Sequence, residues 1–177
     1  MKKNKNLIYY LLMIGIFILF KFWFIYADNS SLAFILKPTS KLVGIVTGSS
    51  SIYLAESGYY FQDTNIIIDK SCSGFNFWLL CYSMLLFLIF KSLQKNSHKL
   101  LAIPSVMLGA YILTILVSTS RIYVSLTIQN SLINFLQIEQ HIIHEAIGVI
   151  TNLTFLVLFF AATKNYSTKL ELNEQLT

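Results

Sequence analysis

Four long apolar runs constrain the fold of this chain more than any other feature. They are residues 7–26, 75–90, 100–120 and 146–163. A helix needs about 20 predominantly apolar residues to cross the hydrocarbon core of a bilayer, and each run is close to that length. A basic residue follows each of the last three runs: Lys91, Arg121 and Lys164. The runs therefore predict an all-α integral membrane protein with about four transmembrane helices.

The overall composition excludes a soluble globular domain. Of the 177 residues, 55% are hydrophobic and only 12% are charged, whereas soluble domains typically carry about 25% charged residues. The net charge is +5, but the lysines lie at the ends of apolar runs, where they set membrane orientation. We therefore expect the lipid bilayer, and no nucleic acid, as a partner. We expect a single polytopic membrane domain over residues 1–164 and a polar, frayed cytoplasmic tail over residues 165–177.

The apolar run at residues 7–26 follows a basic N-terminus, as a signal peptide does. However, the apolar region of a cleaved signal peptide has about 7–15 residues, so we interpret this longer run as a retained first span. In residues 30–51, Lys37 and Lys41 interrupt the apolar stretches. A lysine at the centre of a span costs about 2.5–3.5 kcal/mol, which predicts an interfacial or re-entrant segment instead of a full crossing.

Residues 53–70 predict a small extracytoplasmic insert between the first and second spans. Within it, the β-prone residues 59–61 and 66–68 flank the polar sequence Gln-Asp-Thr-Asn. Two such runs around a short polar turn indicate a β-hairpin.

The lysine distribution predicts the orientation of the spans. Cytoplasmic loops carry an excess of lysine and arginine, so Lys2, Lys3 and Lys5 place the N-terminus in the cytoplasm. After two crossings the lysine-rich loop at residues 91–99 lies on the cytoplasmic side, and after four crossings the segment that follows Lys164 lies there too. We expect a multi-pass protein of the cytoplasmic (inner) membrane with both termini in the cytoplasm.

This topology brings three chemically distinctive residues to one plane. Cys72 precedes the second span, Arg121 follows the third and His144 precedes the fourth, so all three lie at the outer membrane boundary. A thiolate is the reactive form of cysteine, and a neighbouring imidazole or guanidinium lowers the thiol pKa. A cation also stabilises the oxyanion of a tetrahedral intermediate. The three residues therefore predict a nucleophilic thiol site facing outward.

Cys72 and Arg121 each have a simpler alternative. Cys72 lies in a polar turn before an apolar helix, where the helix N-terminus favours the thiolate, but it could be an ordinary loop cysteine or one that pairs with a cysteine of another chain. Arg121 could be a snorkelling interfacial anchor. It is the only arginine in the chain, and its planar fork suits an oxyanion better than an ammonium does. Cys81, in the middle of an apolar run, is interpreted as a small buried hydrophobe.

His144 competes with His141 for the role of the base. The two are three residues apart and would share a helix face, so the spacing alone permits either. A metal site from His141, His144 and Glu145 matches no usual ligand spacing. We therefore expect no metal and no other cofactor.

Three short motifs resemble those of the exosortase/archaeosortase family. They are Ser-Cys-Ser-Gly at 71–74, Ser-Thr-Ser-Arg-Ile at 118–122 and His-Glu-Ala-Ile-Gly at 144–148. The family pattern is approximately C-S-G, then N-x-x-R, then H-x-x-x-G, on successive spans. The chain departs from it at Ser118, where many members carry asparagine. The resemblance covers about residues 59–160, and the short chain is similar to a small subtype such as exosortase K.

The resemblance implies a bacterial membrane-embedded cysteine protease or transpeptidase. Its partners would be exported proteins with a C-terminal sorting signal composed of a motif, a transmembrane helix and a basic tail. Cys72 would be the nucleophile that forms a thioester, His144 the general acid and base, and Arg121 the stabiliser of the oxyanion. The acceptor amine, and the balance between transfer and hydrolysis, stay open. The alternatives are a non-enzymatic assembly or scaffold protein and a metal-dependent membrane protease that uses His141 and His144.

Overall fold

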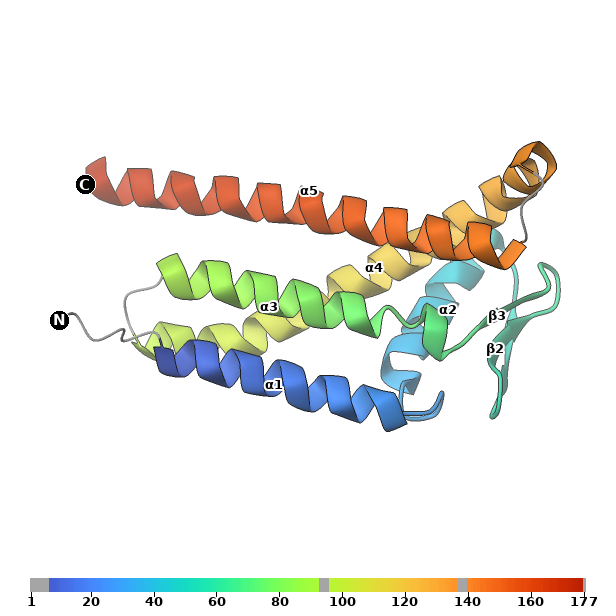
Figure 1. Cartoon of the computed structure of the whole chain (residues 1–177), viewed down its shortest axis with the longest axis horizontal. Helices are drawn as coiled ribbons and strands as arrows, with labels where there is room; N and C mark the ends of the chain where they lie inside the picture. The colour runs from blue at the N-terminus through green and yellow to red at the C-terminus, as the bar shows by residue number, and fades with distance from the viewer. Residues whose placement is uncertain (1–6, 93–95, 137–139, 177) are drawn as a thin grey trace.

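The computed structural model describes the backbone of residues 7–92, 96–136 and 140–176, and the side chains of residues 7–90, 100–128 and 146–164. Its helices are α1 (Leu7–Tyr26), α2 (Ala33–Thr47), the 3-10 turn η1 (Lys70–Cys72), α3 (Phe75–Ser92), α4 (Asn96–Leu136) and α5 (Gln140–Leu176). Its strands are β1 (Ser51–Leu54), β2 (Gly58–Phe61) and β3 (Ile66–Ile68). Four long helices form a bundle, with α2 and the strands at one end (Figure 1). The start of α1 and the end of α5 lie at the opposite end.

The four apolar runs are confirmed as helices long and apolar enough to cross a membrane: Leu7–Tyr26, Lys70–Phe90, Leu100–Ile128 and Ala146–Lys164. Large apolar side chains cover their outer surfaces. Ile8 is 73% exposed and Val149 is 67% exposed. Monomeric soluble proteins rarely expose contiguous apolar surface of this extent, so the helices present the surface that a lipid environment requires.

The helix that contains the third apolar run does not end at Arg121. Helix α4 continues to Leu136, because residues 122–136 contain neither the glycine nor the proline that usually ends a helix. Arg121 therefore lies within a helix. Helix α5 likewise continues beyond the fourth apolar run, to Leu176.

The segment between the first two spans contains α2 and a three-stranded antiparallel sheet in the order β1-β2-β3. At 15 residues, α2 is about 22 Å long, which is shorter than the roughly 30 Å hydrocarbon core. Its buried face includes Ile35, Leu36 and Val43, whereas Lys37 and Lys41 are exposed.

The predicted hairpin is confirmed. Tyr59 pairs with Ile68 and Phe61 pairs with Ile66 in the ladder between β2 and β3. Strand β1, which the sequence analysis did not predict, adds to the other edge of β2. The fold is therefore mostly helical but carries a small sheet at the end of the bundle.

Aromatic side chains hold the start of α3 in the core. Phe75 stacks on Phe24 of α1 with 4.7 Å between ring centroids, and Trp78 contacts Phe75 edge-on at 5.4 Å. The indole Nε1 of Trp78 donates a hydrogen bond of 3.1 Å to the carbonyl oxygen of Met107 in α4. Buried aromatic pairs of this kind contribute about 0.5–1.5 kcal/mol each beyond area burial. They fix the point where the chain turns from the sheet into α3.

Candidate functional site

The turn between β3 and α3 carries Cys72 and is organised by Asp69. One carboxylate oxygen of Asp69 accepts hydrogen bonds from the backbone N–H of Ser71 at 3.0 Å and from the Ser71 hydroxyl at 2.6 Å. It also accepts a longer bond of 3.4 Å from the backbone N–H of Cys72. An aspartate at this capping position satisfies the otherwise unpaired N–H groups of a helical turn. Asp69 therefore sets the shape of η1 around the cysteine.

Lys70 ties the same turn to the end of α1. Its ammonium donates to the carbonyl oxygens of Ile25 at 3.1 Å and Ala27 at 2.7 Å, and it lies 4.9 Å from the ring centroid of Phe24. Its backbone N–H donates to Oδ1 of Asn29 at 2.8 Å. A cation near the last carbonyls of a helix interacts favourably with the helix dipole, so Lys70 joins the turn to the first candidate span.

Gly74 allows the turn to pack directly on α4. Its φ of +70° lies in the left-handed region, which glycine adopts without the steric cost that other residues incur. A Cβ at this position would clash with the hydroxyl of Ser118 and would lie 3.1 Å from Cγ2 of Thr114. Thr114, Ser118, Arg121 and Ser125 are all buried, and their spacing of three and four residues places them on one face of the helix.

Arg121 is buried between this turn and α5. Only 8% of its surface is exposed, whereas a snorkelling side chain keeps its charged head in water. A Cβ at Gly148 of α5 would lie 3.4 Å from Cδ and 3.5 Å from Nη1 of Arg121. Within the part of the chain that the structure describes, Nε of Arg121 has no hydrogen-bond partner. A buried, incompletely paired guanidinium is energetically costly and is therefore a candidate for ligand binding.

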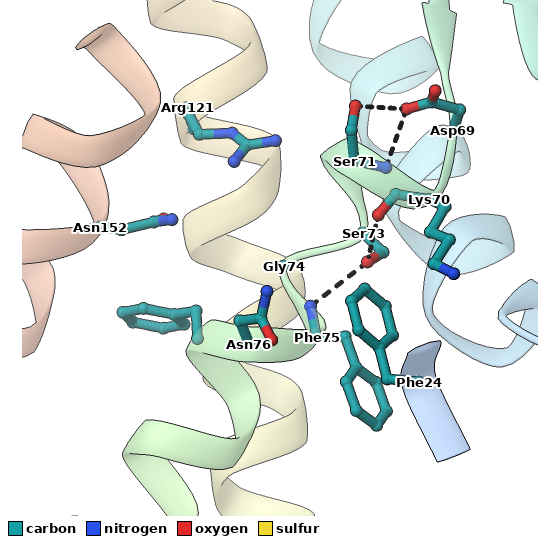
Figure 2. Close-up of a pocket in the computed structure, with 11 residues that line it drawn as sticks. Phe24, Asp69, Lys70, Ser71, Ser73, Gly74, Phe75, Asn76, Arg121 and Asn152 are labelled. Carbon is teal, nitrogen blue, oxygen red and sulfur yellow. Dashed lines mark hydrogen bonds between the residues drawn. The ribbon is translucent and has the colours of Figure 1, made fainter. Parts of the chain in front are cut away.

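A cleft of about 490 Å³ opens beside the guanidinium. Its polar lining includes Ser71 and Ser73 from the turn, Asn76 from α3, Arg121 from α4 and Asn152 from α5. Figure 2 shows Arg121, Asn76 and Asn152 converging on this space from three different helices. The cleft therefore lies between the Cys72 turn and the two longest helices, α4 and α5.

Cys72 itself lines a second, smaller cavity. It is 6% exposed and borders a space of about 40 Å³ together with Ile68 of β3 and Ile122 and Ser125 of α4. Its sequence neighbours Ser71 and Ser73 line the larger cleft. The structure thus brings the Cys72 turn and Arg121 together, with the thiol on the sheet side of the arginine cleft. Neither Cys72 nor Cys81 forms a disulfide.

The side chain of His144 lies outside the described residues, as do those of His141 and Glu145. The backbone of His144 lies in the first turns of α5, one helical turn before Gly148. Positions four residues apart share a helix face, and Gly148 is the position at which α5 meets Arg121.

Asn76 and Asn152 are candidate site residues that the sequence analysis missed. Lys21 of α1 donates a hydrogen bond of 2.6 Å to Oδ1 of Asn76. A possible signal was the presence of single amide side chains within apolar runs, because polar residues inside a membrane segment are rare and frequently functional.

Comparisons with known proteins do not identify a family. No family model matches this chain, and neither a curated protein nor a solved structure matches it. Any functional conclusion therefore depends on the motifs and on the geometry of the site.

Proposed function

We propose that this chain is a membrane-embedded cysteine peptidase or transpeptidase of the exosortase type. Its substrates would be exported proteins with a C-terminal sorting signal of motif, transmembrane helix and basic tail. One observation carries the proposal: the Cys72 turn, the buried Arg121 and the start of α5 meet at one end of the bundle. These segments are far apart in sequence and correspond to the three motifs that resemble the family.

The proposed orientation places the sheet and the site outside the cytoplasmic membrane and both termini in the cytoplasm. The arrangement of the bundle supports this orientation, because α1 begins and α5 ends at the end away from the sheet (Figure 1). The last turn of α3, with Lys91, and the first turn of α4, with Lys99, lie at that same end (Figure 1). Positive charge gathered at one end of a bundle is typical of its cytoplasmic side.

In the proposed reaction, Sγ of Cys72 attacks the scissile carbonyl carbon while His144 accepts the thiol proton. A tetrahedral intermediate forms and collapses as the carbon–nitrogen bond breaks, and His144 protonates the departing amine. The product is a thioester on Cys72. An acceptor amine or water then attacks the thioester, His144 takes the proton of the attacking group, and Cys72 leaves as the thiol.

Arg121 would stabilise the oxyanion of both tetrahedral intermediates. Its guanidinium is held between the turn and Gly148, so little reorganisation is required when charge develops. Burial also strengthens its interaction with a negative charge, because the effective dielectric constant is lower than in water. The absence of a partner for Nε among the described residues leaves a donor for this role.

Thiol labelling combined with a processing assay tests the proposal against a scaffold role. Cys72 is buried in the substrate-free protein, so the reagent must be small. We would apply the anionic reagent 2-sulfonatoethyl methanethiosulfonate to intact cells. We expect slow labelling that persists in Cys81→Ala and disappears in Cys72→Ala. We also expect labelled cells to lose processing of exported proteins. Unchanged processing after complete Cys72 labelling would favour the scaffold alternative.

A further inference from the structure

Each of the four candidate spans contributes a cationic or amide side chain to one region of the bundle. These residues are Lys21, Asn76, Arg121 and Asn152. Asn76, Arg121 and Asn152 line one cleft, and Lys21 bonds to Asn76, so the four side chains lie at one level of the bundle. Charged and amide groups within candidate membrane spans are costly and typically mark substrate pathways.

The bond between Lys21 and Asn76 determines which way the Asn76 amide faces. An ammonium group can only donate hydrogen bonds, so the contact of 2.6 Å must be made with the amide oxygen. The NH₂ group of Asn76 is consequently directed toward the cleft (Figure 2). The bond from Lys21 therefore orients the NH₂ group of Asn76 as a donor toward any ligand in the cleft.

The cleft offers several hydrogen-bond donors. Asn76 directs its NH₂ group into it, Asn152 borders it and Arg121 retains a buried Nε without a partner among the described residues. One oxygen of Asp69, whose carboxylate also lines the cleft, accepts hydrogen bonds from Ser71 within the turn. A ligand that supplies acceptors would complement the donors of Asn76, Asn152 and Arg121. Two of the donors belong to neutral amides. Neutral amides complement the carbonyl oxygens of a ligand better than they complement a fully charged group.

We propose that Asn76 and Asn152 are positioning residues that bind backbone carbonyls of the substrate's transmembrane segment where it leaves the helical conformation. This inference rests on the proposed function. A peptide bond cannot reach a nucleophile while its segment stays helical, and carbonyls released from a helix within a bilayer have no water to replace their lost partners. The amides, together with Arg121, supply those partners inside the membrane. Unwinding of the substrate next to Cys72 thereby becomes less costly.

Two synthetic probe peptides test this inference directly. Each has 20 leucine and alanine residues, a dansyl group at its outer end and a lysine tail at the other. One is uninterrupted, and the other carries a Gly-Pro pair six residues from the dansyl end, where proline frees a backbone carbonyl. Binding to the full-length protein in lipid nanodiscs is followed by energy transfer from tryptophan to dansyl. We expect the interrupted peptide to bind about 5- to 30-fold more tightly, as one or two additional hydrogen bonds would give.

Substitutions of the two asparagines test whether their amides cause the preference for the interrupted peptide. We expect Asn152→Leu to abolish most of it and Asn76→Leu to reduce it independently. Thr154→Val is the matched control on α5, because its hydroxyl bonds to the carbonyl of Ile150 within the same helix, and it should retain the full preference. Equal affinity for the two peptides, or a preference that survives in both asparagine variants, would overturn the inference.

Cys72→Ala separates this inference from the proposed function. The preference for the interrupted peptide should be unchanged in this variant, because binding does not require the thiol. If Cys72→Ala retained normal processing, the proposed cysteine chemistry would fail while the binding result still stood.

Discussion

The turn before α3 and the body of α3 each hold one buried cysteine, but their surroundings differ. Cys72 is 6% exposed and Cys81 is fully buried. Asp69 and two serines shape the turn around Cys72, and the buried guanidinium of Arg121 lines the adjoining cleft. Cys81 lies within an apolar stretch of helix. Burial therefore does not distinguish the two thiols, whereas the polar groups near them do.

This difference has a physical basis. Free cysteine is commonly buried as a small hydrophobe and is then inert. A cysteine becomes a nucleophile when nearby groups stabilise the thiolate and the charge that develops during the reaction. The turn can supply such groups only because Gly74 brings it against α4. The following predictions test whether the two regions differ in function as they differ in surroundings.

The largest expected effect comes from exchanging each cysteine for alanine. Cys72→Ala should abolish processing of exported substrates, because the acyl thioester cannot form. Cys81→Ala should leave processing nearly unchanged and should lower stability by about 1 kcal/mol through loss of a small packed group. Immunoblots for release of the C-terminal signal measure processing, and thermal unfolding in detergent measures stability. Loss of processing in both variants at equal abundance would remove the distinction between the two regions.

The next effect concerns His144, the proposed general base. His144→Ala should slow processing by about 10²–10⁴-fold, the typical contribution of general acid–base catalysis, without changing protein abundance. His141→Ala should be milder, because Gly148, which contacts Arg121, lies one turn from His144. Pulse-labelled substrate gives the rates. An inactive His141→Ala with an active His144→Ala would reassign the base.

Gly74→Ala tests whether close packing on α4 creates the special surroundings of Cys72. The substitution combines a positive φ with a clash against Ser118, and we expect a loss of about 2 kcal/mol or more in stability together with reduced processing. Gly48→Ala is the matched control, because Gly48 has a nearly identical φ of +69° but no atom within 4 Å of the added Cβ. It should show only the conformational cost of about 1 kcal/mol. Equal destabilisation by the two substitutions, measured by thermal unfolding, would show that contact with Ser118 does not matter.

Arg121→Lys gives the smallest expected effect and separates catalysis from anchoring. Lysine keeps the charge but lacks the planar fork of donors. Losing one well-placed oxyanion donor costs about 10²–10³ in rate, so we expect processing to slow by at least about tenfold while the protein accumulates normally. Labelling of Cys72 should persist. Near-normal turnover would show that Arg121 contributes only a buried positive charge to packing and not an oxyanion donor.

Length and apolar content were sufficient to predict four helices long and apolar enough to span a membrane, and two β-prone runs around a polar turn were sufficient to predict the hairpin. The continuation of α4 past Arg121 was not predictable in this way, because a single arginine after about 20 apolar residues normally marks a membrane boundary. Arg121 is instead sheltered within α4 by Gly148 and by the turn, and this shelter depends on tertiary packing. Strand β1 also depends on context, because its short sequence forms a strand by pairing with β2.

The candidate site was predictable in part. Helix topology alone placed Cys72, Arg121 and His144 at one boundary, but it could not place them near one another within that plane. The contact between Gly74 and Ser118 supplies the lateral placement of the turn against α4. Asn76 and Asn152 can be assigned to the candidate site only because they line the same cleft as Arg121.

The bond between Lys70 and the end of α1 has a consequence for biosynthesis. The acceptors of Lys70, the carbonyls of Ile25 and Ala27, lie 43 to 45 residues earlier in the chain. The end of α1 is therefore synthesised well before Lys70, in keeping with the N-terminal-first order of folding. The contacts of Lys70 in this turn form only when α1 packs beside the start of α3. Under the proposed function, formation of the thiol site would thus depend on assembly of the first two spans, and a chain with an unassembled first span would be inactive.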